Sequence, residues 1–128
     1  MHDPIHDTIE LPAPPERIYR ALIDSEQFAA WSGAAADIGA SDGDAFSCFD
    51  SMIAGRNIEL VPNQRIVQAW RVFNWQPGVF SIVRFELTES DSGTRLNFSH
   101  VGFPPEHREH LNVGWAKKYW APLRTFLG

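Results

Sequence analysis

The chain has little of several features that define common functional classes. It contains one cysteine in 128 residues, so no disulfide can form within it and a reducing compartment is expected. Its 11 basic residues form no cluster and are outnumbered by 16 acidic ones, so neither nucleic acid nor an anionic membrane is an expected partner. No apolar run reaches the ~18 residues of a membrane span, and no signal segment opens the sequence. We therefore predict a cytoplasmic protein.

Motifs of familiar enzyme and cofactor classes are also missing. The sequence has no glycine-rich phosphate loop, no nucleophile elbow and no pair of carboxylates in an apolar setting. His107 and His110 have a spacing that can hold a metal ion, but no third ligand is evident and charged residues lie between them. Cys48 has no neighbouring cation in sequence that would activate its thiol. We predict no cofactor, no metal site and an inert cysteine.

Large aromatic residues, by contrast, are abundant. The sequence has 5 Trp and 9 Phe within a hydrophobic content of 44%, which is ordinary for a globular chain. A chain of 128 residues is long enough for one domain with its own core, and no linker or repeat divides it, so we predict a single domain over 1–128. Aromatic rings fill cores and also line ligand cavities, so their number alone does not decide between the two.

The last third of the sequence sets the expected architecture. From Thr94 onward, apolar residues alternate with polar ones, which is typical of a half-buried strand, and the proline pair at 104–105 ends that strand. The period then changes to three and four, which predicts one buried stripe along a long terminal helix. Pro122 should bend or end the last turn of this helix. The stripe is formed by Leu111, Trp115, Tyr119, Pro122 or Leu123, and Phe126.

Upstream of this segment the sequence predicts a short strand at 5–12, two short helices and a series of antiparallel strands. Pro15 and Glu16 suit the first turn of a helix, and Ser25 can begin a second one. Turn signals then separate strand patterns at 45–50, 55–61, 65–73 and 80–88, with a weaker one at 36–40. The fold class is therefore α+β, with one face of the sheet covered and the other wet.

Several segments, taken in order, resemble the family of activator of heat-shock-protein-90 ATPase homologues, within the START-like (birch-pollen-allergen-like, SRPBCC) superfamily. They begin with Pro-Pro-Glu-Arg-Ile-Tyr-Arg-Ala-Leu at 14–22 and end with Gly-Trp at 114–115. The others are residues 28–31, 59–62, 65–67, 70–71, 93–96 and 100–103. The resemblance implies a helix-grip fold, in which a curved antiparallel sheet of about six strands wraps a long C-terminal helix. It also implies an apolar cavity between them.

The resemblance has consequences for partners as well. Small single-domain members resemble carriers of hydrophobic molecules, so a hydrophobic small molecule or lipid is the expected partner. The eukaryotic namesake couples such a domain to a larger N-terminal chaperone-binding domain. Because this chain is predicted to be the single START-like domain, chaperone contact is the weaker expectation, and a homodimer is a further one.

A cavity between sheet and helix would be lined by the inward side chains of both. For the strand at 65–73 the sequence leaves the inward face open, and we predict that Trp70 points inward. Taken one at a time, each of the aromatic residues in this set is more often plain core than the wall of a pocket. The predicted ligand-binding residues are Trp31, Phe46, Ile58, Trp70, Val83, Phe85, Leu96, Phe98, His100, Leu111, Trp115 and Tyr119.

His100 is the most informative polar residue in this set. By alternation it follows Phe98 onto the inward face, where it could bond a ligand or act as a general acid or base. Alternatively, it could be tied to the backbone at the proline corner, where it would fix the approach of the helix. Gly114 has two interpretations as well: it could open space at the helix, or permit close packing against Trp70.

Three functions follow from these features. The leading hypothesis is a module that binds a hydrophobic ligand. The second is an enzyme of the cyclase or dehydratase kind using His100, which needs a second polar group such as Gln68, Tyr19 or Tyr119; we rank an enzyme below a binding module. The third is a chaperone-linked or homodimeric interaction module, for which the place to look is an exposed apolar patch of Phe73, Trp75 and Phe80.

Overall fold

The computed structural model describes residues 4–128, which form one antiparallel sheet with helices on one side. The sheet has 7 strands in the order β1-β7-β6-β5-β4-β3-β2, so the first strand of the sequence lies beside the last. The α+β class is confirmed, and the strand beyond the expected six is the two-residue β2. The strands are β1 (Ile5–Leu11), β2 (Asp37–Ile38), β3 (Ala45–Cys48), β4 (Ile53–Val61), β5 (Arg65–Val72), β6 (Ser81–Ser90) and β7 (Gly93–Val101).

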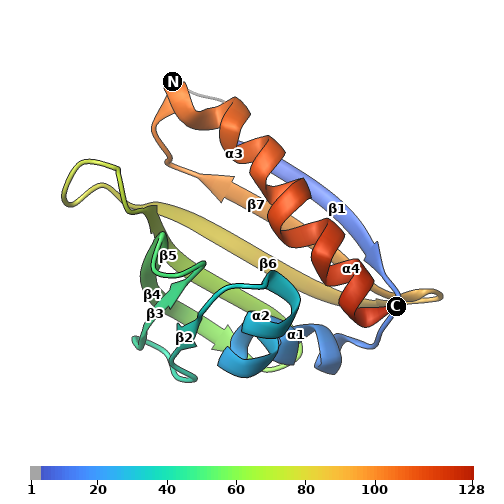
Figure 1. Ribbon diagram of the computed structural model, residues 1–128. Helices are drawn as coiled ribbons and strands as arrows, with labels where there is room; N and C mark the ends of the chain where they lie inside the picture. Colours follow the sequence, from blue (N-terminus) through green and yellow to red (C-terminus); the bar gives the residue numbers. More distant parts are fainter. Residues whose placement is uncertain (1–3) are drawn as a thin grey trace.

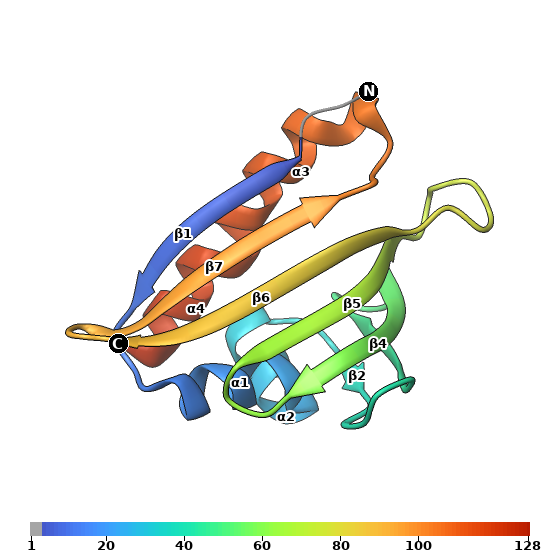
Figure 2. The ribbon, with the colours of Figure 1, turned by 180° about the vertical axis from the view of Figure 1, so that it is seen from behind.

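All helices lie against the same face of this sheet (Figure 1). The C-terminal helix crosses β1 and β7, and the two short helices lie under β5 and β6. Seen from behind, the other face carries no helix (Figure 2). We call these the covered face and the open face. The helices are α1 (Pro15–Ile23), α2 (Ser25–Ser32), the 3₁₀ turn η1 (Pro105–His107), α3 (Arg108–Gly114), the π-helical segment η2 (Trp115–Trp120) and α4 (Ala121–Leu127).

Local signals place α1 and α2 where the sequence predicts them. Proline occupies the first turn of α1, where its missing N–H would have no partner anyway, and Glu16 lies at the positive end of the helix dipole. The Asp24 carboxylate accepts a hydrogen bond from the backbone N–H of Gln27 at 3.1 Å and so caps α2. Gly33 ends α2 with a φ of 77°, a left-handed conformation that glycine adopts without strain.

The long C-terminal helix is continuous from Arg108 to Leu127, but its middle is π-helical. The backbone keeps right-handed helical dihedrals at the two junctions, Gly114 and Trp120. Because Pro122 has no N–H to donate to a preceding turn, the change from π to α bonding just before it accommodates the missing donor. The wider π turn also brings the consecutive residues Tyr119 and Trp120 into the core, whereas the helical spacing predicted only Tyr119.

A β-bulge in β4 corrects one sequence prediction. The register between β4 and β5 shifts between Asn57 and Glu59. This shift turns Asn57 inward, where it is fully buried, and leaves Ile58 at 48% exposure. The prediction that Ile58 lines the interior is therefore wrong. It assumed that inward and outward residues alternate strictly along β4, and the extra residue of the bulge interrupts this alternation.

The turn between β3 and β4 has an unusual backbone. Three consecutive residues, Phe49, Asp50 and Ser51, have φ values of 53°, 57° and 71°. Left-handed conformations are costly for residues with a Cβ, and the surrounding structure must hold them in place. Asp50 supplies such a restraint, because its carboxylate accepts the Ala35 N–H at 2.8 Å while its own N–H donates to the Ala35 carbonyl at 3.1 Å.

Candidate functional site

The space between the covered face and the C-terminal helix is the predicted ligand site. Apart from Ile58, every predicted lining residue is at most 6% exposed there. Trp70 points inward as predicted, since Ile66, Gln68 and Trp70 are the buried residues of β5. The residues brought together are Trp31, Phe46, Trp70, Val83, Phe85, Leu96, Phe98, His100, Leu111, Trp115 and Tyr119.

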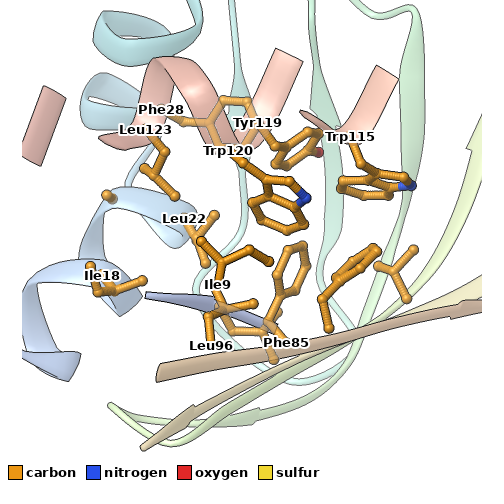
Figure 3. Close-up of a cluster of buried hydrophobic side chains, with 14 of the residues drawn as sticks. Ile9, Ile18, Leu22, Phe28, Phe85, Leu96, Trp115, Tyr119, Trp120 and Leu123 are labelled. Atoms are coloured by element: carbon orange, nitrogen blue, oxygen red, sulfur yellow. The ribbon is translucent and has the colours of Figure 1, made fainter. Parts of the chain in front are cut away.

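Trp115 lies at the centre of this interior. Its ring centroid is 4.3 Å from that of Phe98 and 4.3 Å from that of Tyr119, and it packs at 5.3 Å against Trp70. Figure 3 shows Trp115, Tyr119 and Trp120 extending from the helix toward the side chains of the sheet. Tilted and edge-on ring pairs at these distances are favourable beyond the area they bury.

These rings leave almost no empty space. The small cavity beside Tyr119, between α2 and strands β3, β5 and β6, has a volume of about 10 Å³, which is room for a single water molecule at most. Ligand pockets of proteins have volumes of about 300 Å³ or more. The interior is thus filled by the protein's own side chains. The cavity is lined by Leu22, Phe28, Ile38, Phe46, Cys48, Ile66, Gln68, Phe85 and Tyr119.

His100 is fully buried, and both of its ring nitrogens are hydrogen-bonded. The indole N–H of Trp115 can only donate, and it lies 3.0 Å from His100 Nδ1, so Nδ1 is the acceptor. In the neutral ring the proton is then on Nε2, which donates to Ser81 Oγ at 2.7 Å. Ser81 in turn donates to the Trp70 carbonyl at 3.1 Å. This relay ties the C-terminal helix to three strands.

Burial lowers the pKa of His100 from 6.5 to about 3. A neutral ring is also what the relay requires, because a proton on Nδ1 would face the indole N–H of Trp115. His100 therefore fixes the approach of the helix, as one interpretation of the sequence held, although it does so through Trp115 and not through the backbone of the proline corner. No ring nitrogen is left for a substrate.

A second polar group lies near the small cavity. Gln68 Nε2 donates to Asn57 Oδ1 at 3.1 Å, and Asn57 Nδ2 donates to the Gly39 carbonyl at 2.7 Å. The Cys48 sulfur lies 4.0 Å from the Tyr119 hydroxyl, and burial raises the pKa of the thiol to about 12, so this cysteine is inert at neutral pH. Asn57 was missed by sequence reasoning, because only the bulge turns it inward.

Of the other polar candidates, Gln68 and Tyr119 border the small cavity and Tyr19 does not. Tyr19 instead lines an open groove of about 530 Å³ between α1, α2 and the β4–β5 turn. Within residues 4–128 no group of three potential metal ligands comes together. His107 stacks on Trp75, with ring centroids 6.4 Å apart.

The Trp75 side chain corrects another prediction. It is 6% exposed and packs against Trp70, so it does not belong to an exposed patch. Phe73 and Phe80, on either side of it, are 62% and 48% exposed. Trp75 was expected to be exposed because it lies in a loop. Its indole is buried by His107 and Trp70, whose proximity the local sequence does not reveal.

Known proteins with this arrangement identify the family. Residues 12–128 match the family described as "Activator of Hsp90 ATPase homolog 1-like protein". The chain belongs to this family. The human activator of 90 kDa heat shock protein ATPase homolog 1 is 28% identical over 114 residues, which are 89% of this chain and 34% of that protein. An uncharacterised Schizosaccharomyces pombe protein is 29% identical over 124 residues, covering 97% of this chain and 37% of its own length.

The chain thus spans about a third of the length of these curated relatives. Two solved structures match over nearly their whole length. An HSP90 activator from Plasmodium falciparum has a TM-score of 0.89 at 25% identity, with 98% of this chain and 96% of that one covered. The Aha1 dimer from Colwellia psychrerythraea has a TM-score of 0.83 at 20% identity over 98% and 96%, which shows the shared fold. None of the helices within residues 4–128 is long and apolar enough to cross a membrane.

Proposed function

We propose that this domain is a protein-interaction module that binds an Hsp90-family ATPase and raises its rate of ATP hydrolysis. The observation that carries the choice of an interaction module over a carrier is the filled interior, which has a cavity of about 10 Å³. The choice of partner is supported by family membership and by the names of the human and Plasmodium falciparum relatives.

The test is a titration of the purified protein into an Hsp90-family ATPase, with hydrolysis of ATP as the readout. We expect a saturable increase in rate that is abolished by an inhibitor specific for the Hsp90 ATP site. Binding is measured in parallel by calorimetry, so that an interaction without stimulation is also detected. Neither binding nor stimulation, with a protein that melts cooperatively, would contradict the proposal.

A second candidate function is the binding of an apolar ligand. It is favoured by one observation, the π-helical segment that carries Trp115 and also Tyr119, which lines the small cavity, because π-helical turns occur frequently at functional sites. A ligand would need these rings to move apart. A co-purifying mass in native mass spectrometry, or a melting temperature that rises with the concentration of lipids or flat aromatic compounds, would support this function.

A catalytic His100 has less support, since both of its ring nitrogens are occupied. A cyclase or dehydratase of this type would have to expose His100 to its substrate first. The same mass spectrometry and melting experiments test this alternative, because an enzyme pocket must also open to bind.

A further inference from the structure

We infer that the open face of the sheet, at the end near the β5–β6 loop, is the surface by which this domain docks on its partner protein, and that the partner presents apolar residues bordered by carboxylates. The inference rests on the proposed function and adds the surface and its chemistry. The residues concerned are Met52, Phe73, Phe80, Ile82 and Val101, which we call the outer patch; their exposures run from 38% to 62%.

Strand register brings the outer patch together. Ile82 pairs with Val101 on one side and with Ala69 on the other, so these three residues form one row across β5, β6 and β7. Phe73 donates its backbone N–H to the Met52 carbonyl at 2.8 Å, which places those two residues side by side at the same end. Figure 2 looks onto the face that carries the row, and no helix lies in front of it.

The exposure of these residues is not explained by the fold. An antiparallel sheet with one wet face normally carries polar residues there. Large exposed apolar patches in single domains mark interaction sites. The exposed Val113, on the C-terminal helix away from this face, is by contrast a single residue, and scattered single residues are ordinary.

Arginines give the outer patch its charge. Arg56 pairs with Ala69 in the central row, and Arg84 follows Ile82 by two positions on the same face of β6. Arg71 lies under Phe80, with its guanidinium carbon 5.7 Å from the ring centroid. Of these three arginines, only Arg84 has a carboxylate within 4.0 Å among the described residues, namely Glu86 at 3.1 Å. This region is positive on a chain whose net charge is −5.

A positive, partly apolar surface is complementary to an acidic, partly apolar one, because opposite charges at the rim steer association and apolar contacts hold the complex. The Arg71 guanidinium also donates to the carbonyls of Trp75 at 2.7 Å and Gln76 at 2.9 Å, so the loop behind Phe80 is held in shape before binding. A preformed surface loses less entropy on association.

The backbone at the edge of the outer patch supplies a second observation. The left-handed residues Phe49–Ser51 directly precede Met52, whose N–H donates to the Phe49 carbonyl at 3.1 Å. Strained backbone of this kind is retained most often at functional sites. The turn holds Met52 beside Phe73, where it extends the outer patch beyond the end of the strands.

The experiment compares two single substitutions in binding to the Hsp90-family ATPase of the proposed function. Ile82→Glu places a carboxylate at the centre of the outer patch and should weaken binding by about tenfold or more. Val113→Glu makes the same change at an exposed apolar residue on the helix, and it should alter binding by less than about twofold. A third variant, Arg84→Gln, should weaken binding and reduce its dependence on salt concentration.

The outcomes separate the two proposals. If wild-type protein does not bind the ATPase, the proposed function fails and this surface with it. If wild type binds and Ile82→Glu binds equally well, the docking surface is wrong and the proposed function stands. A wild-type homodimer in analytical ultracentrifugation that Ile82→Glu converts to a monomer, with ATPase binding unchanged, would assign the outer patch to a second copy of the chain and overturn the inference.

Discussion

The two faces of the sheet differ sharply, although the same strands form both. Along β6, Val83, Phe85 and Leu87 are buried on the covered face, whereas Ile82 and Arg84 alternate with them on the open face. On the covered face every predicted aromatic ring packs against other buried side chains, so core packing explains its presence. On the open face Ile82 is 38% exposed and lies beside an arginine. Apolar residues on the covered face are thus explained by stability, and those on the open face require another explanation.

Aromatic richness in a sequence does not show whether the rings leave room for a ligand between them. The side chains that appeared most suited to a ligand fill the core and leave a cavity of about 10 Å³. The exposed apolar residues of the open face are hard to recognise in a sequence, and their exposure is not explained by packing of the core. Four perturbations test this difference between the two faces.

Removing the central ring of the covered face should have the largest effect. Trp115→Ala should lower the free energy of unfolding by about 3–5 kcal/mol, because a large cavity forms and the relay through His100 is broken. Urea titration followed by circular dichroism measures the change. Val113→Ala, two residues earlier and 47% exposed, is the control and should change it by less than about 0.5 kcal/mol. Equal losses of unfolding free energy in the two variants would show that Trp115 does not pack against the covered face.

Acid should destabilise the protein through the covered face. The pKa of His100 is about 3 when folded and 6.5 when unfolded, so below pH 6.5 the unfolded chain binds a proton that the folded chain does not. Protonation of His100 in the unfolded chain therefore leaves the free energy of unfolding unchanged above pH 6.5. As the pH falls from 6.5 toward 3, it lowers this free energy by about 1.4 kcal/mol per pH unit. Denaturant titrations at pH 6, 5 and 4 measure this slope. His100→Gln should flatten it, and an unchanged slope in that variant would contradict the buried neutral ring.

Adding a methyl group to a glycine of the sheet should lower the free energy of unfolding, whereas the same addition to a glycine of the C-terminal helix should not. In Gly55→Ala the new Cβ would clash with the Ala69 carbonyl oxygen, and we expect a loss of about 1–3 kcal/mol in unfolding free energy. Gly114→Ala is the matched control. It meets no atom within 4 Å and has a helical φ of −61°, so it should raise stability by about 1 kcal/mol. Thermal melts of both variants test the pair, and a destabilising Gly114→Ala would indicate unrecognised close packing.

The smallest effect on stability should come from the open face. Ile82→Glu should lower the unfolding free energy by no more than about 1 kcal/mol, because its side chain is 38% exposed and the new carboxylate can reach water. Val83→Glu, at the next position, would bury a carboxylate and should prevent stable folding. Urea titration compares them. A large loss in Ile82→Glu would mean that the outer patch is part of the core.

Most of the fold could be predicted from the sequence, because periodicity and turn residues act locally. The alternation of Leu96, Phe98 and His100 and the prolines at the start of α1 gave the right elements. Ile58 was misplaced because a bulge reverses the alternation at a single residue. Trp120 was missed because its burial follows from a π-helical turn, whose period differs from the assumed 3.6 residues.

The candidate site was predicted less well than the fold. Which residues face inward could be read from alternation, but not whether they leave room between them, because volume depends on how rings from separate elements interdigitate. The hydrogen-bond partners of His100 could not be predicted either, since Ser81 and Trp115 belong to other elements of the fold. The stack of Trp75 on His107 joins two segments that no local pattern connects.

The pairing of β1 with β7 has a consequence for folding. Ile5 pairs with His100 and Leu11 with Thr94, so the partners are 95 and 83 positions apart in a chain of 128 residues. Trp120 reaches back to Asp7 at 3.3 Å, and Arg17 to the Leu127 carbonyl at 3.4 Å. Contacts of such high sequence separation slow folding, since long loops must close first. During synthesis on the ribosome β1 has no pairing partner until β7 has emerged, so its apolar side chains stay exposed throughout that interval.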